Sequence, residues 1–173
     1  MTDRGYTLIE LTVVVLLIGM MLLISVPRVR DSLLADDLNA AARHLAGASW
    51  ELRNEAIREQ VDYILSLDLS HPGFWVYSAD TTPEKLVEIR KEAIRFPNGV
   101  KIADFSQPGE AKKTEGEVDL RFYRKGYVEP AVVHLTKDDR TFTIVFHPFF
   151  NKVSVYEKYA DFTFNEEGRT SGL

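Results

Sequence analysis

With 173 residues, the chain is long enough for one folded core beside an extended helix, but not for two cores. Its formal net charge of −5 argues against a general affinity for DNA or anionic lipid. Its lack of cysteine excludes disulfides, thiolate metal sites and cysteine nucleophiles.

The chain begins with a long apolar run. Residues 6–26 carry one charged side chain, Glu10. As a helix, this run would be about 31 Å long, enough to cross a hydrocarbon core of about 30 Å. A charged side chain near the middle of a membrane costs roughly 3 kcal/mol on insertion scales, so Glu10 needs a partner. Pro27 ends the run and predicts a kink, because it lacks a backbone N–H and clashes with the carbonyl of Leu23.

The residues around Gly5 form a recognisable motif. The segment Gly-Tyr-Thr-Leu-Ile-Glu-Leu, behind a short polar leader, resembles the prepilin peptidase signal of type IV pilins and type II secretion pseudopilins. The resemblance implies cleavage after Gly5, N-methylation of the new terminus at Tyr6, and a role in assembly for Glu10, the fifth mature residue. It also matches Gly19 and Pro27 to the family's glycine and proline, where the helix is expected to bend. Tyr6 stands where the family usually has Phe, and a plain signal anchor is the alternative.

Residues 28–60 predict an amphipathic continuation of this helix. Apolar side chains recur every three or four residues and form one stripe that must be buried. The members of this stripe are Leu34, Leu38, Ala41, Leu45, Ala48, Leu52 and Ala56. The opposite face carries charged residues, which are Asp36, Arg43, Glu51 and Glu55.

Residues 61–173 predict a β-rich domain that covers the stripe. Runs of β-branched and aromatic residues between turn signals predict seven or eight short antiparallel strands. These runs are residues 63–69, 74–78, 86–90, 119–123, 131–135, 141–147 and 152–156. The predicted fold class is α+β, with a long N-terminal helix packed on an antiparallel β-sheet domain, two sheets being favoured. The polar segment 104–117 is predicted to be a mobile loop.

Segments scattered over residues 40–156 resemble the GspH/FimT group of the pilin-like family. They include Leu-Arg-Phe-Tyr-Arg-Lys-Gly and the later Phe-Thr-Ile-Val-Phe-His-Pro-Phe-Phe-Asn, in which Asn151 stands near the family's expected Gly. The resemblance implies an H-type minor pseudopilin that helps to initiate or cap the periplasmic pseudopilus of type II secretion. A FimT-type minor pilin, acting in pilus assembly or DNA uptake, is the alternative. The last twelve residues hold one Arg against two Glu, which disfavours DNA binding.

The resemblance further implies a domain order and a location. Residues 1–5 would be the leader, 6–27 the transmembrane half of the helix, 28–60 its periplasmic half and 61–173 the globular domain. The chain would cross the bacterial inner membrane once, with its N-terminus in the cytoplasm, and would enter the pseudopilus after assembly. Its partners would be the prepilin peptidase, other minor pseudopilins, the major pseudopilin and the inner membrane, and no nucleic acid is expected.

The sequence lacks a motif typical of an enzyme or of a metal site, so no catalytic residue, cofactor or metal is expected. Metal-ligand spacing is absent from the four histidines, which are His44, His71, His134 and His147. His134 is expected to be a satisfied core or surface residue, and Asp138-Asp139 is expected to form a hairpin turn. A solvated tail is favoured over a calcium site for the last acidic residues, which are Asp161, Glu166 and Glu167.

Four large side chains raise the question of subunit contacts. Trp50 and Trp75 are expected to anchor the helix on the sheet, with a subunit interface as the alternative for one of them. Arg53 and Arg58 are expected on a solvated helix face, with pairing to neighbouring subunits as the alternative.

Overall fold

The computed structural model describes the backbone of residues 8–97, 99–149, 152–164 and 170–172, and their side chains except those of 22–36, 163–164 and 170–172. Contacts divide the chain into two units, Met1–Asp36 and Asp37–Leu173. The first unit holds the N-terminal part of one helix. The second holds the rest of that helix and the strands.

Helix α1 spans Leu8–Glu59 and is assigned without a break across Gly19 and Pro27. In the second unit, the predicted apolar stripe is buried. Exposure is 2% or less for Leu38, Ala41, Leu45, Leu52 and Ala56. Arg43 and Glu51, on the opposite face, are exposed. The 3.6-residue periodicity therefore predicted the packing face of α1 correctly wherever its side chains are described.

Sheet 1 has the strand order β3-β2-β1-β5, and its neighbours pair in antiparallel fashion. Its strands are β1 (Tyr63–Asp68), β2 (Gly73–Ser78), β3 (Ile94–Arg95) and β5 (Glu117–Phe122). Alternate residues of β5 are buried, as expected for a strand with one face on a core. Helix α2 (Pro83–Lys91) follows β2 in the chain and contacts it.

Sheet 2 has the strand order β4-β6-β7-β8, again antiparallel. Its strands are β4 (Lys101–Ser106), β6 (Ala131–Lys137), β7 (Arg140–Phe146) and β8 (Val153–Tyr156). Asp138 and Asp139 form the hairpin turn between β6 and β7, as predicted, and Asp138 has a φ of 52°, which Asp tolerates better than most residues. The short strands β9 (Phe162–Phe164) and β10 (Thr170–Gly172) pair with each other.

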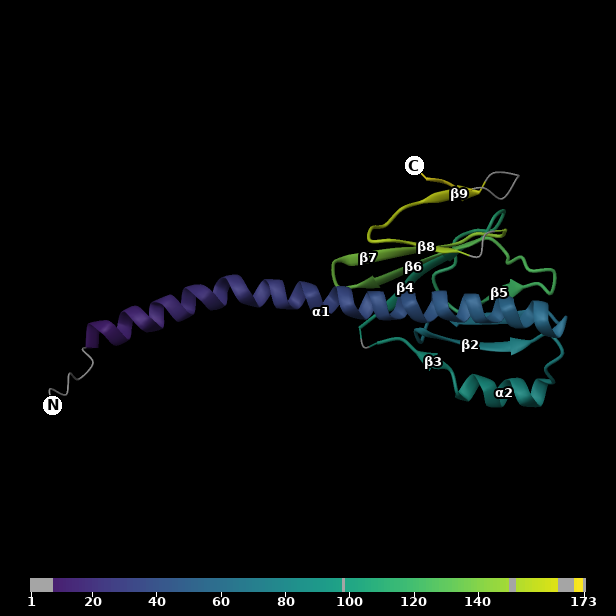
Figure 1. Cartoon of the computed structure of the whole chain (residues 1–173), viewed down its shortest axis with the longest axis horizontal. Coiled ribbons are helices and arrows are strands. Elements are labelled where there is room, and N and C mark those ends of the chain that lie inside the picture. Colours follow the sequence, from purple (N-terminus) through teal and green to yellow (C-terminus); the bar gives the residue numbers. More distant parts are fainter. Residues whose placement is uncertain (1–7, 98, 150–151, 165–169, 173) are drawn as a thin grey trace. The chain divides into compact units, whose positions relative to one another are not determined.

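One hydrophobic core joins the second part of α1 to both sheets, and Figure 1 shows this part of the helix running alongside them. Phe74 and Phe122 of sheet 1 and Phe105, Phe142 and Phe146 of sheet 2 are fully buried in it. Burying one such side chain stabilises the fold by roughly 1.5–3 kcal/mol. The predicted α+β class, with a long helix on two antiparallel sheets, is confirmed.

One predicted strand was wrong, because residues 86–90 belong to helix α2. Helix signals at both ends outweigh the apolar character of this segment. Pro83 and Glu84 stand in the first turn, and Arg90 stands in the last turn, where a positive charge is favoured. Val87 is 57% exposed, so the apolar residues here did not indicate a buried strand.

The prediction of a mobile loop over residues 104–117 was wrong at both ends, because residues 104–106 end strand β4 and Glu117 begins strand β5. The chain then turns back, and Lys113 pairs with Phe105 through two main-chain hydrogen bonds of 2.8 and 2.9 Å. The polar residues of this segment therefore belong to an exposed turn whose main chain is hydrogen-bonded to strand β4.

Candidate functional site

The N-terminal part of α1 is apolar on all sides. From Leu8 to Met21, the one charged side chain is Glu10, and every residue is exposed. Ile9 and Met21 are 71% and 72% exposed. A helix that is apolar all round is normally buried in a protein core or in lipid, so this surface requires a cover.

Among the stretches of helix whose side chains are described, none combines the length and the apolarity needed to cross a membrane.

The residues predicted for processing and assembly belong to the first unit. Gly5 and Tyr6 lie outside the described residues, whereas Glu10 is exposed in the first turn of α1. A Cβ added at Gly19 would meet no atom within 4 Å, so no contact in the described chain requires a glycine there. The side chain of Pro27 is not described, and bends at Gly19 and Pro27 stay predictions.

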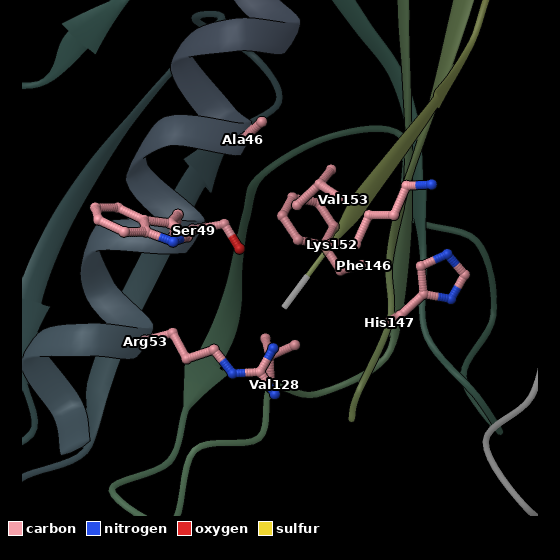
Figure 2. A pocket seen from close by; sticks show the side chains of 9 residues that line it. Ala46, Ser49, Arg53, Val128, Phe146, His147, Lys152 and Val153 are labelled. Atoms are coloured by element: carbon pink, nitrogen blue, oxygen red, sulfur yellow. The ribbon is translucent and has the colours of Figure 1, made fainter. Parts of the chain in front are cut away.

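Arg53 ties helix α1 to two loops of the β domain. Its Nε donates to the Gly126 carbonyl (2.6 Å) and its Nη2 donates to the Pro148 carbonyl (3.2 Å). Burial lowers the pKa of Arg53. The side chain is 8% exposed, and Figure 2 shows it extending away from the helix. The expectation of a solvated face was therefore wrong for Arg53, whose side chain is buried and bonds to the loops at Gly126 and Pro148.

The two tryptophans lie in different environments. Trp75 is buried on β2, as expected, but its cover is α2 and not α1, because the guanidinium carbon of Arg90 lies 5.3 Å from the centre of its ring. Trp50 is 59% exposed on α1, so the expectation that it anchors the helix was wrong. Arg58 is exposed, as expected, and forms ion pairs within its own helix.

A shallow hollow of about 30 Å³ lies beside Trp50 and Arg53 (Figure 2). It has room for about two water molecules and none for an organic substrate. His147, which lines it, has its Nε2 3.0 Å from the Ser154 Oγ. Burial, and then the charge of Lys152, lowers the pKa of His147. The hollow thus offers structural contacts and little room for chemistry.

A buried polar group joins β4, β6 and the C-terminal segment. His134 is 1% exposed, with its Nδ1 2.6 Å from the Asp104 Oδ1 and its Nε2 3.1 Å from the Ala160 carbonyl. Both ring nitrogens therefore have a hydrogen-bond partner, one a side-chain carboxyl group and the other a main-chain carbonyl. Tyr159 stacks on this ring, with 4.0 Å between the ring centres. His134 is therefore a satisfied core histidine, as predicted, and it holds the segment that leads to β9.

Asp104 should make the folded state sensitive to acid. Burial alone would raise the pKa of its carboxyl group, but the hydrogen bond and charge of His134, with the charge of Lys112, hold that pKa below its ordinary value of 3.8. When folding lowers the pKa of a carboxyl group, the ionised group stabilises the folded state at any pH above its ordinary pKa. This stabilisation is lost as the pH falls through the lower pKa of the folded state.

We therefore expect Asp104→Asn to reduce stability at neutral pH and to flatten the further loss of stability below about pH 4. Urea unfolding of both proteins from about pH 7 to about pH 3 measures this difference. Curves of the same shape for the two proteins would contradict it.

Within the described part of the chain, no three His, Asp or Glu side chains are grouped so as to hold a metal ion. Asp161 accepts a hydrogen bond of 2.5 Å from the Lys112 Nζ. Asn151, Glu166 and Glu167, named above for a turn and for calcium, lie outside the described residues.

Comparison with curated proteins finds similarity to Type II secretion system protein H of Pseudomonas aeruginosa. The two sequences are 24% identical over 137 residues, which is 79% of this chain and 78% of that protein. No protein-family model matches the chain.

Among solved structures, the chain is similar to the minor pseudopilin EpsH from the type II secretion system of Vibrio cholerae. The TM-score is 0.53 at 12% sequence identity, covering 72% of this chain and 98% of that structure. A second EpsH structure matches with a TM-score of 0.47. At this low identity, the first match shows a shared fold: a long helix packed on two antiparallel sheets.

Proposed function

We infer that the chain, a GspH-type pseudopilin by its sequence similarity and its fold, is a minor subunit that helps to initiate or cap the pseudopilus of type II secretion. The observation that supports this role most directly is the division of the chain into an apolar, exposed helical unit and a domain with its own core. A filament subunit needs both parts, because its helix packs in the shaft while its domain selects neighbours. The role is structural and involves no catalysis.

The apolar part of α1 supports a stay in the inner membrane before assembly. Lipid would cover the exposed side chains of this part, which a helix cannot leave in water. In this proposal, residues 6–27 cross the membrane, the N-terminus stays in the cytoplasm and the β domain lies in the periplasm. When subunits leave the bilayer, helices of other minor pseudopilins and of the major pseudopilin replace the lipid.

Processing by the prepilin peptidase is proposed from the motif around Gly5. In a host with an active peptidase, the intact mass of the full chain extracted from membranes should lack Met1–Gly5 and include one methyl group on Tyr6. Gly5→Val should keep the leader, because a peptidase that approaches the backbone closely rejects a larger side chain. A wild-type mass that still includes the leader would contradict the proposal.

A clean deletion, complemented with the wild-type gene, tests the proposed function. Protein secretion by the type II system should be lost in the deletion strain and restored by complementation. Normal secretion combined with lost twitching or DNA uptake would point instead to a type IV minor pilin.

A further inference from the structure

Residues 157–161 form a strap that leads from β8 to β9 over the outer face of sheet 2. Thr143 of β7 lies on that face, because the residues on either side of it belong to the hydrophobic core. Its hydroxyl donates a hydrogen bond of 2.7 Å to the Lys158 carbonyl and accepts one of 3.0 Å from the Ala160 N–H. The strap lies wholly within the described part of the chain and contributes no member to the hydrophobic core, so polar contacts carry its attachment.

Two further side chains hold the strap, one from β6 and one from the turn after β4. Tyr159 stacks on His134 of β6, and its hydroxyl lies 3.2 Å from the Asp104 Oδ2. From the turn after β4, the Lys112 Nζ donates hydrogen bonds to the Tyr159 hydroxyl (2.7 Å) and to the Asp161 carboxylate (2.5 Å). The strap is therefore bound through a small number of side chains, of which His134 is the most deeply buried.

The contacts of His134 fix the number of protons that this site needs. A carbonyl has no proton, so the contact of 3.1 Å between Nε2 and the Ala160 carbonyl is a hydrogen bond only when Nε2 carries one. The contact of 2.6 Å between Nδ1 and Asp104 needs a second proton, which either partner can carry. When one of the two protons is lost, the ionised carboxylate holds the other on Nδ1, because hydrogen bonds to a charged acceptor are the stronger ones. The Nε2 lone pair then faces the Ala160 carbonyl, and this contact with the strap becomes repulsive.

The other groups around His134 leave this proton count unchanged. Charged or titratable side chains face His134 and its partners from β4, from the turn after β4 and from the strap, and β7 contributes the uncharged Thr143. These side chains are Asp104, Lys112, Tyr159 and Asp161. The hydrogen bonds to Asp161 and Tyr159 raise the pKa of Lys112, so this lysine stays charged while His134 and Asp104 exchange a proton.

We propose that the strap is a pH-sensitive device, bound to sheet 2 while His134 and Asp104 together hold two protons and released when one of these protons leaves. The bound state holds one proton more than the released state, so a rising pH favours release, by at most about tenfold per pH unit. Release would uncover His134 and Thr143, which are 1% and 0% exposed beneath the strap. The domain would thus present a different surface at each end of the pH range, whichever subunits surround it.

A spin label on the strap tests this proposal. The chain has no cysteine, so one introduced cysteine carries the label at one known position. Lys158→Cys places it on the strap at an exposed side chain and keeps the main-chain carbonyl that Thr143 contacts, whereas Glu88→Cys places it on the exposed face of α2 as a control. Electron paramagnetic resonance of the full chain in detergent, from about pH 5.5 to about pH 9, measures the ratio of fast to slow label. Circular dichroism verifies the fold of each labelled protein.

We expect this ratio to rise about tenfold or more over the pH range at position 158, along a curve for one proton, and to stay constant at position 88. A constant ratio at position 158, or an equal rise at both positions, would overturn the proposal. These two curves decide without any change to the residues that bind the strap.

Asp104→Asn and Asp161→Asn, each combined with the label at position 158, separate the proton count from a general loss of negative charge. An amide at position 104 can donate to Nδ1 while a neutral ring donates from Nε2 to the Ala160 carbonyl, so Asp104→Asn should keep the strap bound across the whole range. Asp161→Asn removes the ion pair with Lys112 and should raise the ratio about threefold at every pH, while the rise with pH remains. A wild-type rise in Asp104→Asn, a strap released at every pH in that variant, or no rise in Asp161→Asn would each overturn the proposal.

Discussion

Replacing Glu10 by leucine should leave cleavage and abundance unchanged, while secretion falls about tenfold or more, as expected for losing one partner of a charge pair in a medium of low dielectric. In the full chain, Glu10 is the one charged side chain within residues 6–26. The described members of the hydrophobic core begin at Leu38, far along the chain from Glu10, so we expect the domain to fold without this charge.

Glu10 has two candidate partners. Glu10 lies four residues after Tyr6, and such positions share one face of a helix, so the carboxylate could pair with the new amine of its own chain. The family resemblance implies instead the amine of an adjacent subunit. Leucine would relieve a burial cost in the first case. In the second case, it would leave the neighbour's amine unpaired, and we expect this outcome.

Val13→Leu is a matched control for Glu10→Leu, because Val13 is exposed in the same apolar part of α1 and its replacement changes no charge. Abundance and cleavage are followed by immunoblot and intact mass, and secretion by the activity of an exported enzyme. Secretion at the wild-type level from the Glu10→Leu strain, with equal protein, would rule out an essential pair between subunits.

Periodicity in the sequence predicted the packing of α1 better than residue type did. Leu45 and Leu52 lie on the stripe and are buried. At about 100° per residue, Trp50 lies roughly 140° around the helix from Leu45, on the far side from the core. The expectation that Trp50 anchors the helix relied on the usual burial of tryptophan. The angular position of Trp50 around the helix would have predicted an exposed side chain instead.

The contacts of Arg53 and Asp104 could not be predicted from the sequence. Arg53 bonds to carbonyls 73 and 95 residues away, and any residue type supplies a carbonyl. Asp104 lies 30 residues from His134, and its polar surroundings in the sequence indicated a loop. The position of β5 at the edge of sheet 1 also could not be predicted, because it follows from the strand order, which local sequence patterns do not determine.

Arg53→Ala should lower the free energy of unfolding by about 3 kcal/mol, since the charge-assisted hydrogen bonds to the Gly126 and Pro148 carbonyls are lost, and only the Pro148 carbonyl keeps a second donor, the Val128 N–H. The loops at Gly126 and Pro148 would then lose their tie to α1. Urea unfolding of the full chain in detergent, followed by circular dichroism, measures the change.

Two further variants separate this effect from a general loss of positive charge on the helix. Arg58→Ala removes an exposed arginine whose ion pairs stay within α1, so its unfolding midpoint should match the wild type. Arg53→Lys keeps the charge but has no planar fork to bond two carbonyls in different loops, so it should recover part of the loss. Equal midpoints for Arg53→Ala and Arg58→Ala would show that the link from α1 to the loops does not stabilise the domain. A midpoint for Arg53→Lys at the wild-type value would show that charge, and not the bidentate geometry, is what the site requires.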